Sequence, residues 1–335
     1  MDRRSVRTFL GVDGGGTKTD FLLIDDAGRV LATRRAGSAY YLETGADSVE
    51  QMLVTGIDGI LRAAGVAPGS VGFAFIGLPS YGEDSRLLGR LDRVAATVFP
   101  VERYRCGNDM VCGWAGALAG LDGISVVAGT GSIAYGEFDG QSARAGGWGE
   151  LFSDEGSAFW IARQALRLFS RMSDGRTKKA PLYDLVRQHF SVSTDLDVCG
   201  AVYGPPPLTR SELAALAPIV ARAARAGDLE AQQIFQAAAH ELAAIVHAVR
   251  DTLAVPPATT LPVSYSGGMF QLDSLLAPLL RAALQTATRK YEFTAPQMSP
   301  SAGAALYAAK LAGTPLTLEA VAQLTRTDPI RALGG

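Results

Sequence analysis

The chain has 335 residues, of which 48% are hydrophobic and 19% are charged, and its formal net charge is −2 at pH 7. This length allows two domains, and this composition is typical of a globular protein and argues against a disordered chain. The near-neutral charge, without a long basic run, argues against nucleic-acid binding. No apolar stretch reaches the about 18 residues of a membrane span, and the N-terminus has no signal-peptide core, so we expect a cytoplasmic protein with no membrane partner.

The first predicted element is a β-hairpin with a glycine-rich tip. Residues 11–20 read GVDGGGTKTD and lie between the apolar runs FL and FLLID. Lys18 does not follow a glycine as in a P-loop, and Thr19 stands where a dinucleotide fingerprint has its third glycine. The apolar run after the glycines therefore predicts a second strand, with residues 14–17 at the tip. Glycines there permit positive φ and let backbone N–H groups converge on an anion, so the tip is either an ordinary tight turn or a phosphate site.

The rest of the first third alternates strands and helices. Apolar periodicity, a capping box at Ser48 and Gln51 and a stop at Gly65 define its first helix. The pattern predicts, in chain order, a strand over 29–35, a helix over 49–64, a buried strand over 71–79, a helix over 84–99, a strand over 102–106 and, after Gly-Asn-Asp at 107–109, a helix of small residues.

The same order of elements recurs from Gly123, where the sequence reads GISVVAGTGSIAYGEFDG. The second series consists of this hairpin, a short strand near 143, a helix over 156–169, a strand over 261–268, a helix over about 272–287, a strand over 290–294 and a helix over 301–313. A mostly helical insertion over about 173–257 interrupts it. Each copy has a Gly-Thr turn in its first hairpin, and two such turns can bind a polyphosphate from both sides. The repeat therefore favours the phosphate interpretation of the first turn.

Five motifs in this order resemble one known family. They are DGGGTKT at 13–19, GTGS at 129–132, GGWG at 146–149, SDEGSAFWIA at 153–162 and SGG at 266–268. Together they resemble the N-acetylglucosamine kinase group of the BadF/BadG/BcrA/BcrD-type ATPases, within the actin-like, sugar-kinase and Hsp70 superfamily, over about residues 9–313.

The resemblance implies an α/β fold of duplicated ribonuclease H-like (actin-like ATPase) domains with an interdomain cleft that holds ATP and, deeper, a sugar. The first domain would span 1–118, with the helix 301–313 packed back on it, and the second would span 119–300 with its insertion. Residues 314–335 would form a tail that begins with one or two amphipathic turns and then becomes irregular.

The resemblance also implies which residues bind ATP and Mg²⁺. One set would hold the terminal phosphates and the adenosine: Gly15, Gly16 and Thr17 from the first domain, and Gly129, Thr130, Gly131, Gly267, Gly268 and Ala214 from the second. Ala214 is the weakest of these matches, because alanines in a helix are also explained by close packing. Asp13 corresponds to the acid that holds Mg²⁺ through water, and its other interpretation is a turn-forming residue before glycines.

Asp109 is the expected catalytic residue. By resemblance it is the general base that accepts the hydroxyl proton of the sugar; a plain N-cap of the helix that follows is the alternative. Gly147, Trp148 and Gly149 would approach the sugar, and Asp154 would accept hydrogen bonds from its hydroxyls. Trp148 is equally explained as a buried anchor at the domain interface.

Tyr40 is a departure from the family pattern. It stands in GSAYY, where many relatives have an asparagine that binds the sugar. A phenol either contacts the sugar, by stacking or by donating a hydrogen bond, or turns away and leaves a wider pocket. The identity of the sugar therefore stays open.

The expected function is ATP- and Mg²⁺-dependent phosphorylation of the 6-hydroxyl of N-acetylglucosamine, by a homodimer formed through the second domain. Glucosamine and muramic-type amino sugars are alternative substrates. A second class is a BadF-type ATPase that activates an acyl-CoA dehydratase through an iron–sulfur cluster, but Cys106 and Cys112 flank Asp109 in a predicted strand and helix, which suits cluster ligation poorly. A third is a non-catalytic nucleotide-binding or assembly module, against which the sugar-site motifs argue.

Overall fold

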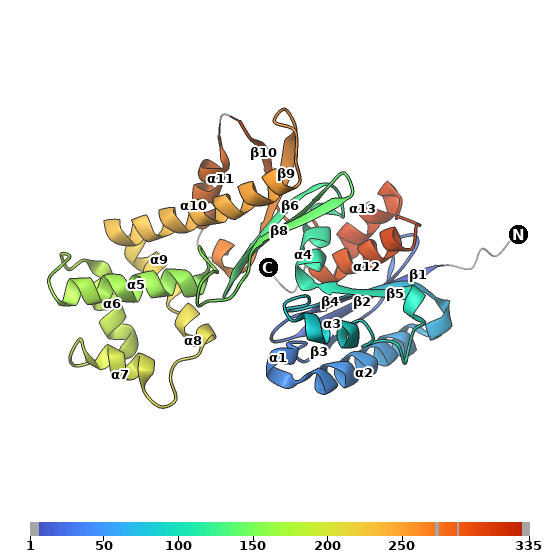
Figure 1. Ribbon diagram of the computed structural model, residues 1–335, viewed down its shortest axis with the longest axis horizontal. Helices are drawn as coiled ribbons and strands as arrows, with labels where there is room; N and C mark the ends of the chain where they lie inside the picture. The colour runs from blue at the N-terminus through green and yellow to red at the C-terminus, as the bar shows by residue number, and fades with distance from the viewer. Residues whose placement is uncertain (1–6, 272–274, 287, 330–335) are drawn as a thin grey trace, which may run out of the picture. The chain divides into compact units, whose positions relative to one another are not determined.

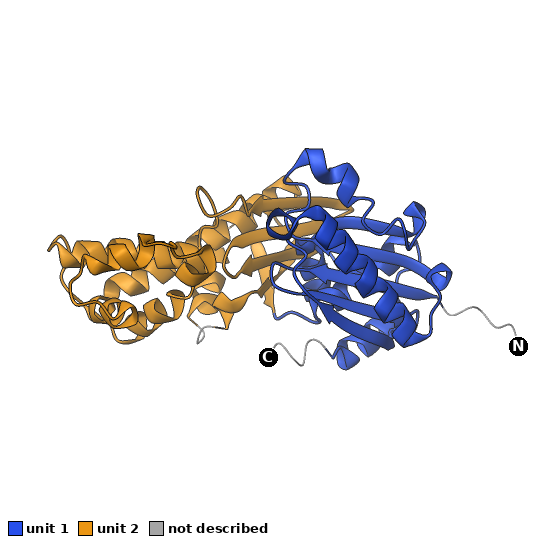
Figure 2. Ribbon diagram, turned by 90° about the horizontal axis from the view of Figure 1, so that it is seen from below, with its two compact units in different colours: residues 1–122, 295–335 blue, residues 123–294 orange. Residues whose placement is uncertain are grey.

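Two compact units make up the computed structural model, which describes residues 7–271, 275–286 and 288–329 (Figures 1 and 2). Unit 1 comprises residues 1–122 and 295–335, and unit 2 comprises residues 123–294. Each contains one five-stranded mixed sheet, with the strand orders β3-β2-β1-β4-β5 and β8-β7-β6-β9-β10. The two orders are equivalent, strand for strand, so the duplication expected from the sequence is present in the fold.

Unit 1 begins with an antiparallel meander and continues with parallel strands. Its elements are β1 (Thr8–Gly14), β2 (Thr19–Asp25), β3 (Val30–Ala36), α1 (Tyr41–Thr44), α2 (Ala46–Ala64), η1 (Pro68–Ser70), β4 (Val71–Leu78), α3 (Ser85–Leu91), η2 (Val101–Arg103), β5 (Tyr104–Asn108), α4 (Asp109–Leu118), α12 (Pro300–Leu311) and α13 (Leu318–Thr327).

Helices cover both faces of the unit 1 sheet. Along β1, Leu10 and Val12 point to the face covered by α2, where they belong to the same buried cluster as Leu53. Gly11, on the opposite face, lies directly under α12, because a Cβ on it would be 2.2 Å from the Ser301 carbonyl oxygen. Side chains alternate between faces along a strand, so burial on both faces explains the apolar runs at 9–12 in β1 and 21–24 in β2.

Glycines let α12 pack closely on α4. A Cβ on Gly303 would lie 2.0 Å from the Gly116 amide nitrogen, and a Cβ on Gly116 would lie 2.5 Å from the Ser299 carbonyl oxygen. The Met298 N–H also donates to the Gly116 carbonyl at 3.0 Å. The C-terminal segment therefore completes the core of unit 1, although nearly two hundred residues separate it from α4 in the sequence.

Unit 2 repeats the meander and adds an all-helical insertion between the two halves of its sheet. Its elements are β6 (Gly123–Ala128), β7 (Ser132–Phe138), β8 (Gln141–Gly146), α5 (Ala158–Ser173), α6 (Pro181–Phe190), α7 (Asp197–Tyr203), α8 (Arg210–Ala214), α9 (Ala217–Arg225), α10 (Leu229–Thr252), β9 (Thr260–Ser266), η3 (Gly268–Phe270), α11 (Leu276–Leu284) and β10 (Lys290–Thr294). The long helix α10 packs on β7 and β8 and contacts the helices α5 and α9.

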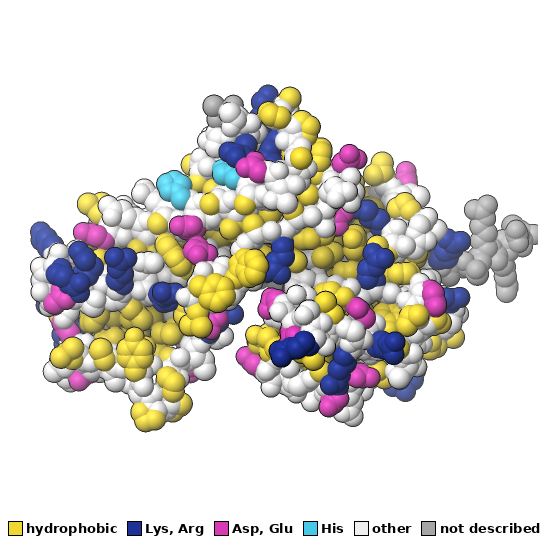
Figure 3. Space-filling model, in the orientation of Figure 1, with side chains coloured by type: hydrophobic (Ala, Val, Ile, Leu, Met, Phe, Trp, Pro, Cys, Tyr) yellow, Lys and Arg dark blue, Asp and Glu magenta, His cyan; other side chains and the backbone are white. Residues whose placement is uncertain are grey.

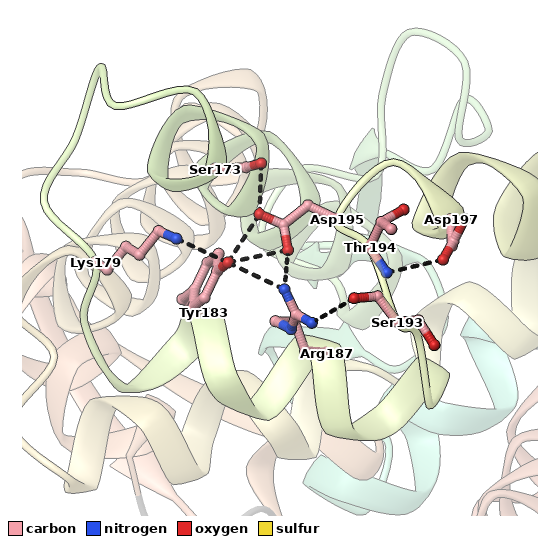
Figure 4. Close-up of polar contacts among 8 residues, drawn as sticks. All are labelled: Ser173, Lys179, Tyr183, Arg187, Ser193, Thr194, Asp195 and Asp197. Atoms are coloured by element: carbon pink, nitrogen blue, oxygen red, sulfur yellow. Dashed lines mark hydrogen bonds and ion pairs between the residues drawn. The ribbon is translucent and has the colours of Figure 1, made fainter.

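A polar network orders the outer end of the insertion (Figure 4). The carboxylate of Asp195 accepts hydrogen bonds from Ser173 at 2.7 Å and from Tyr183 at 2.8 Å, and it forms an ion pair with Arg187. These residues come from the end of α5, from α6 and from the segment before α7, so the network ties three elements together. Figure 3 shows Lys and Arg side chains gathered over α5 and α6.

Two predicted elements differ in length from the observed ones. The helix expected over 84–99 ends at Leu91, after which N–H groups such as that of Ala96 bond to carbonyls three residues earlier. Val94 and Phe99 are still buried, so the apolar pattern marks a core-facing segment of consecutive turns. In the tail, α13 is a regular helix of 10 residues, longer than the one or two turns expected.

Part of the helix predicted over 272–287 falls at 272–274 and 287, outside the described residues. The helix α11 lies within the remainder.

Across the described ranges, none of the helices combines the length and the apolar character needed to cross a membrane.

Replacing Gly303 with alanine should destabilise unit 1, because the new Cβ would overlap the backbone of α4. We expect a loss of about 2 kcal/mol in the free energy of unfolding, measured by urea denaturation. Gly113→Ala is the matched control, since Gly113 is also helical and a Cβ there meets nothing within 4 Å; it should be neutral or slightly stabilising. Equal effects of the two substitutions would contradict the packing described here.

Candidate functional site

The tip of the first hairpin is a narrow, open turn in unit 1. Gly14 pairs with Thr19, and the Gly15 N–H donates to the Lys18 carbonyl at 2.9 Å. Gly16 and Thr17 are exposed, and a Cβ on Gly16 would meet nothing within 4 Å. Neither Gly15 nor Gly16 has positive φ, so that part of the sequence argument is wrong: these glycines leave room for a ligand at the tip without adopting the left-handed conformation.

Asp13 and Asp109 come from different elements and meet beside this hairpin. Asp13 is near the end of β1, and Asp109 is the first residue of α4. Gly77 of β4 lies between these elements, because a Cβ on it would be 2.3 Å from Cys112 Sγ and 3.1 Å from Asp109 Cα. The missing side chain at this position therefore lets the start of α4 approach the ends of β1 and β4.

Asn108, and not Asp109, caps α4. The Asn108 Oδ1 atom accepts a hydrogen bond from the Met110 N–H at 3.1 Å, and its amide nitrogen donates to the Tyr81 carbonyl at 3.2 Å. The plain N-cap interpretation of Asp109 is therefore wrong. Asn108 was not predicted as the cap from the sequence, although asparagine before a helix is a common cap.

Burial raises the pKa of both carboxyl groups. For Asp13 the pKa rises to about 8, first because of burial and then because of the charges of Asp109 and Asp20, while Lys18 lowers it. For Asp109 it rises to about 6, again mainly because of burial, with backbone N–H groups of the helix start lowering it in part and Glu83 raising it. Because the charge of Asp109 acts on Asp13, a cation bound there would relieve the repulsion. Shifted pKa values of this kind are typical of functional sites.

Tyr40 lies beside the hairpin tip. It is the residue before α1, its N–H is bonded to Ser38 Oγ at 3.0 Å, and it is half-buried. The preceding residue, Ala39, donates its N–H to the Gly15 carbonyl at 3.0 Å. Unit 1 therefore brings Tyr40, the hairpin tip, Asp13 and Asp109 to one end of its sheet.

In unit 2 the Gly129–Ser132 turn rests on the start of α5. The Gly129 N–H donates to the Gly131 carbonyl at 2.9 Å, and the Ala158 N–H donates to the Gly129 carbonyl at 2.9 Å. Ser157 caps α5 through the Trp160 N–H at 3.2 Å. Thr130, at the tip of the turn, is exposed.

Gly267 packs against the same turn. It has a φ of 100°, and a Cβ on it would lie 2.4 Å from the Ala128 carbonyl oxygen and 3.0 Å from the Gly129 nitrogen. Both the conformation and the close approach require glycine. The predicted residues Gly267 and Gly268 therefore adjoin the predicted phosphate turn, and Gly268 itself is exposed.

Asp154 is buried behind the turn and paired with Arg210. Its carboxylate accepts a hydrogen bond from the Ser132 N–H at 3.3 Å and forms an ion pair with the Arg210 guanidinium. Burial raises the pKa of Asp154, and the charge of Arg210 partly offsets this rise. Arg210 opens α8, which also contains the buried Ala214. Arg210 was not predicted as a site residue, because an arginine at the start of a surface helix gives no functional signal without the contact across 56 residues.

The segment between β8 and α5 presents apolar side chains to solvent. Gly147 and Gly149 have φ values of 70° and 94°, and Trp148 between them is 68% exposed. The Arg144 guanidinium lies 5.5 Å from the Trp148 ring centroid. Leu151 and Phe152 are also exposed, so Trp148 is not a buried anchor within its own unit.

Comparison with known proteins decides the family. The model of the BadF/BadG/BcrA/BcrD ATPase family matches residues 10–308. The chain belongs to this family. It is 27% identical over 316 residues to the N-acetyl-D-glucosamine kinase of Dictyostelium discoideum, covering 91% of this chain and 98% of that one. It is 28% identical over 256 residues to the N-acetylmuramic acid/N-acetylglucosamine kinase of Clostridium acetobutylicum, covering 73% of this chain and 80% of that one.

A solved structure of a proposed N-acetylglucosamine kinase from Chromobacterium violaceum is similar with a TM-score of 0.68 and 30% identity, covering 91% of this chain and 99% of that chain. The fold also matches that of a glucokinase of the ROK family from Streptomyces griseus, with a TM-score of 0.53 and 18% identity, covering 91% of this chain and 98% of that chain. The family and the actin-like α/β fold expected from the five motifs are thereby confirmed.

Asp13→Asn should raise the melting temperature of the metal-free protein by an amount that grows with pH. The ordinary pKa of 3.8 applies to the unfolded chain, and the folded value is about 8. Between these values the folded state keeps a proton that the unfolded state has lost, so Asp13 makes the wild type less stable as pH rises. Melting curves from pH 4 to 8.5 in EDTA should diverge, reaching a difference of a few degrees near pH 8.

Asp26→Asn is the control for this prediction, since Asp26 is an exposed aspartate of the same unit. A difference between Asp13→Asn and the wild type that does not change with pH would contradict the raised pKa.

Proposed function

We propose that the protein is an ATP-dependent amino-sugar kinase that phosphorylates the 6-hydroxyl of N-acetylglucosamine, with Asp109 as the general base. The observation that carries the proposal is the placement of Asp109: Asn108 takes over the capping of α4, and Asp109 is half-buried near Asp13, whose pKa its charge raises. The sugar kinases among the relatives supply the reaction class.

In this proposal the two Gly-Thr turns bind the phosphates of ATP. Gly15, Gly16 and Thr17 present exposed backbone and hydroxyl groups from unit 1. Thr130, between Gly129 and Gly131, does so from unit 2. The close contact between Gly267 and the Gly129 turn supports a nucleotide path from the phosphates along the end of β9, with Gly268 and Ala214 on the adenosine side.

Asp109 would act by accepting one proton. As the sugar oxygen attacks the terminal phosphorus, its hydroxyl proton moves to the Asp109 carboxylate and the bond between that phosphorus and ADP breaks. A pKa of about 6 suits the role, because the group is ionised at neutral pH yet more basic than an exposed aspartate. Tyr40 on the same end of unit 1, and Gly147, Trp148, Gly149 and Asp154 of unit 2, would position the sugar.

Asp13 fits a magnesium ligand. Among the described residues no group of three or more His, Cys, Asp or Glu side chains could hold a metal on its own. Mg²⁺ needs no such cage, because it is usually held by one or two carboxylates, waters and the substrate phosphates. Bound Mg²⁺ would neutralise charge on the phosphates, and Asp13 would hold it while the cation offsets the repulsion between Asp13 and Asp109.

The sugar is argued from relatives of three specificities. Their names give N-acetyl-D-glucosamine for the Dictyostelium protein, N-acetylmuramic acid and N-acetylglucosamine for the Clostridium protein, and glucosamine for a Vibrio cholerae protein that is 26% identical over 190 residues. N-acetylglucosamine is common to the two longer alignments and is the substrate we propose. Glucosamine is the alternative that the Tyr40 position keeps open.

An ATPase that activates a dehydratase is the less suitable alternative. Such a protein needs cysteines that converge on a cluster between subunits. Cys106 and Cys112 are buried within unit 1, and burial raises the pKa of both thiols, which disfavours the thiolate form that ligates iron. Cys199 lies in the other unit.

We also infer a cytoplasmic homodimer formed through unit 2. The family resemblance supports this state, and the exposed side chains of Leu196 and Tyr203, each 80% accessible, offer apolar surface on unit 2 for it.

Asp109→Asn should abolish sugar-dependent turnover and leave nucleotide binding intact. We expect the rate of ADP release with ATP and Mg²⁺ to fall by about 10²–10⁴-fold, the usual contribution of a general base. The assay should compare N-acetylglucosamine, glucosamine, N-acetylmannosamine, N-acetylmuramic acid and glucose, with Asp26→Asn as the control. ATP hydrolysis that no sugar stimulates, equal in wild type and Asp109→Asn, would refute the kinase.

The pH dependence should report the same carboxylate. Because Asp109 must be ionised to accept a proton, kcat/KM for the sugar should fall about tenfold per pH unit below about pH 6. At saturating Mg²⁺ and ATP the fall should begin at a lower pH, since a nearby cation favours the charged form. A profile with no fall down to pH 4 would contradict the role of Asp109.

A further inference from the structure

The Arg210 side chain lies against the backbone of the Gly129–Ser132 turn. A Cβ on Gly131 would lie 2.3 Å from Arg210 Nη2, so the guanidinium rests directly on the turn. The start of α8 holds this arginine in place, because Thr209 and Glu212 form a capping box around it. Glycine at 131 is therefore explained by the guanidinium that lies where its side chain would be.

The guanidinium is bound only in part. Nη2 pairs with the buried carboxylate of Asp154, and Nε lies 3.5 Å from a Glu150 oxygen. Nε is itself shielded from solvent, and it makes no hydrogen bond to any described residue. Arginine carries five N–H donors arranged for bidentate contact with oxyanions. The side chain is about one-third exposed, so a ligand on the turn can reach it.

We propose that Arg210 binds a terminal phosphate of the nucleotide that occupies the Gly129–Ser132 turn, exchanging its ion pair with Asp154 for the phosphate oxygens. The inference rests on the proposed function, which places a polyphosphate on this turn. A turn of backbone N–H groups and hydroxyls supplies dipoles but no full positive charge, and the transferred phosphoryl group requires charge neutralisation. Arg210 supplies that charge from unit 2.

The alternative is that Arg210 serves only to hold Asp154 and α8 in place. The two roles differ in what a substitution does to phosphate-bearing and phosphate-free ligands. Loss of a phosphate contact lowers the affinity for ATP and ADP but leaves the affinity for adenosine unchanged. Loosening of α8, which contains Ala214, lowers the affinity for all three ligands alike. Removing the charge of Asp154 also distinguishes the two roles. If Arg210 binds phosphate, the phosphate no longer competes with the Asp154 carboxylate for the guanidinium.

The test is calorimetric titration of the full-length chain, without sugar, with adenosine, ADP and ATP. Arg210→Gln should lower the affinity for ATP and ADP by about tenfold or more, the usual effect of losing a charge-assisted hydrogen bond. The affinity for adenosine should change by less than about twofold. Asp154→Asn keeps an oxygen acceptor for the Ser132 N–H and should strengthen ATP binding. Arg222→Gln, at an exposed arginine of α9, is the matched control and should bind all three ligands as the wild type does.

The inference would be overturned if Arg210→Gln lowered the affinity for adenosine and for ATP equally, or if it left the affinity for ATP unchanged. The result is independent of the kinase assay: sugar-stimulated turnover with unchanged ATP affinity in Arg210→Gln refutes the role of Arg210 alone. Loss of ATP affinity in that variant, together with a wild type that no sugar stimulates, refutes the sugar-kinase proposal and leaves Arg210 as a phosphate ligand.

Discussion

The close contact of α12 with β1 and α4 is the constraint on which unit 1 depends. Gly11, Gly116 and Gly303 bring three backbones to distances that no side chain would allow. The strand that ends near Asp13 and the helix that starts at Asp109 are thus both held by the same C-terminal helix. The packing of these backbones therefore determines the relative position of the two carboxylates. Gly77 contributes as well, because its missing side chain lets α4 lie against β4.

Each unit also has charged side chains beside its Gly-Thr turn. In unit 1, burial raises the pKa of both Asp13 and Asp109, and the negative charge of Asp109 raises the pKa of Asp13 further; a divalent cation would relieve this repulsion. In unit 2, Arg210 lies on the turn and is balanced by Asp154. The two repeats therefore keep one topology but differ in the charged side chains beside the turn.

Much of this organisation could be predicted from the sequence, because local patterns determine it. The apolar runs and glycine turns identify both meanders and their order, and Gly-Asn-Asp identifies the start of α4. What the sequence could not show depends on contacts across long separations. Arg210 reaches Asp154 over 56 residues, and α3 stops at Leu91 although its apolar pattern continues. The cap of α4 could not be predicted either. Asn108 and Asp109 are both capping residues, and only the backbone conformation shows that Asn108 bonds to the first turn.

The chain leaves unit 1 after residue 122 and returns to it at residue 295. During synthesis on the ribosome, unit 2 is therefore a continuous segment that can fold as soon as it emerges, whereas the nascent unit 1 must wait. Until α12 arrives, the face of β1 around Gly11 and the adjoining side of α4 are open apolar surface, exposed to chaperones or to self-association. Unit 1, which is the first to be synthesised, is therefore the second to complete its core.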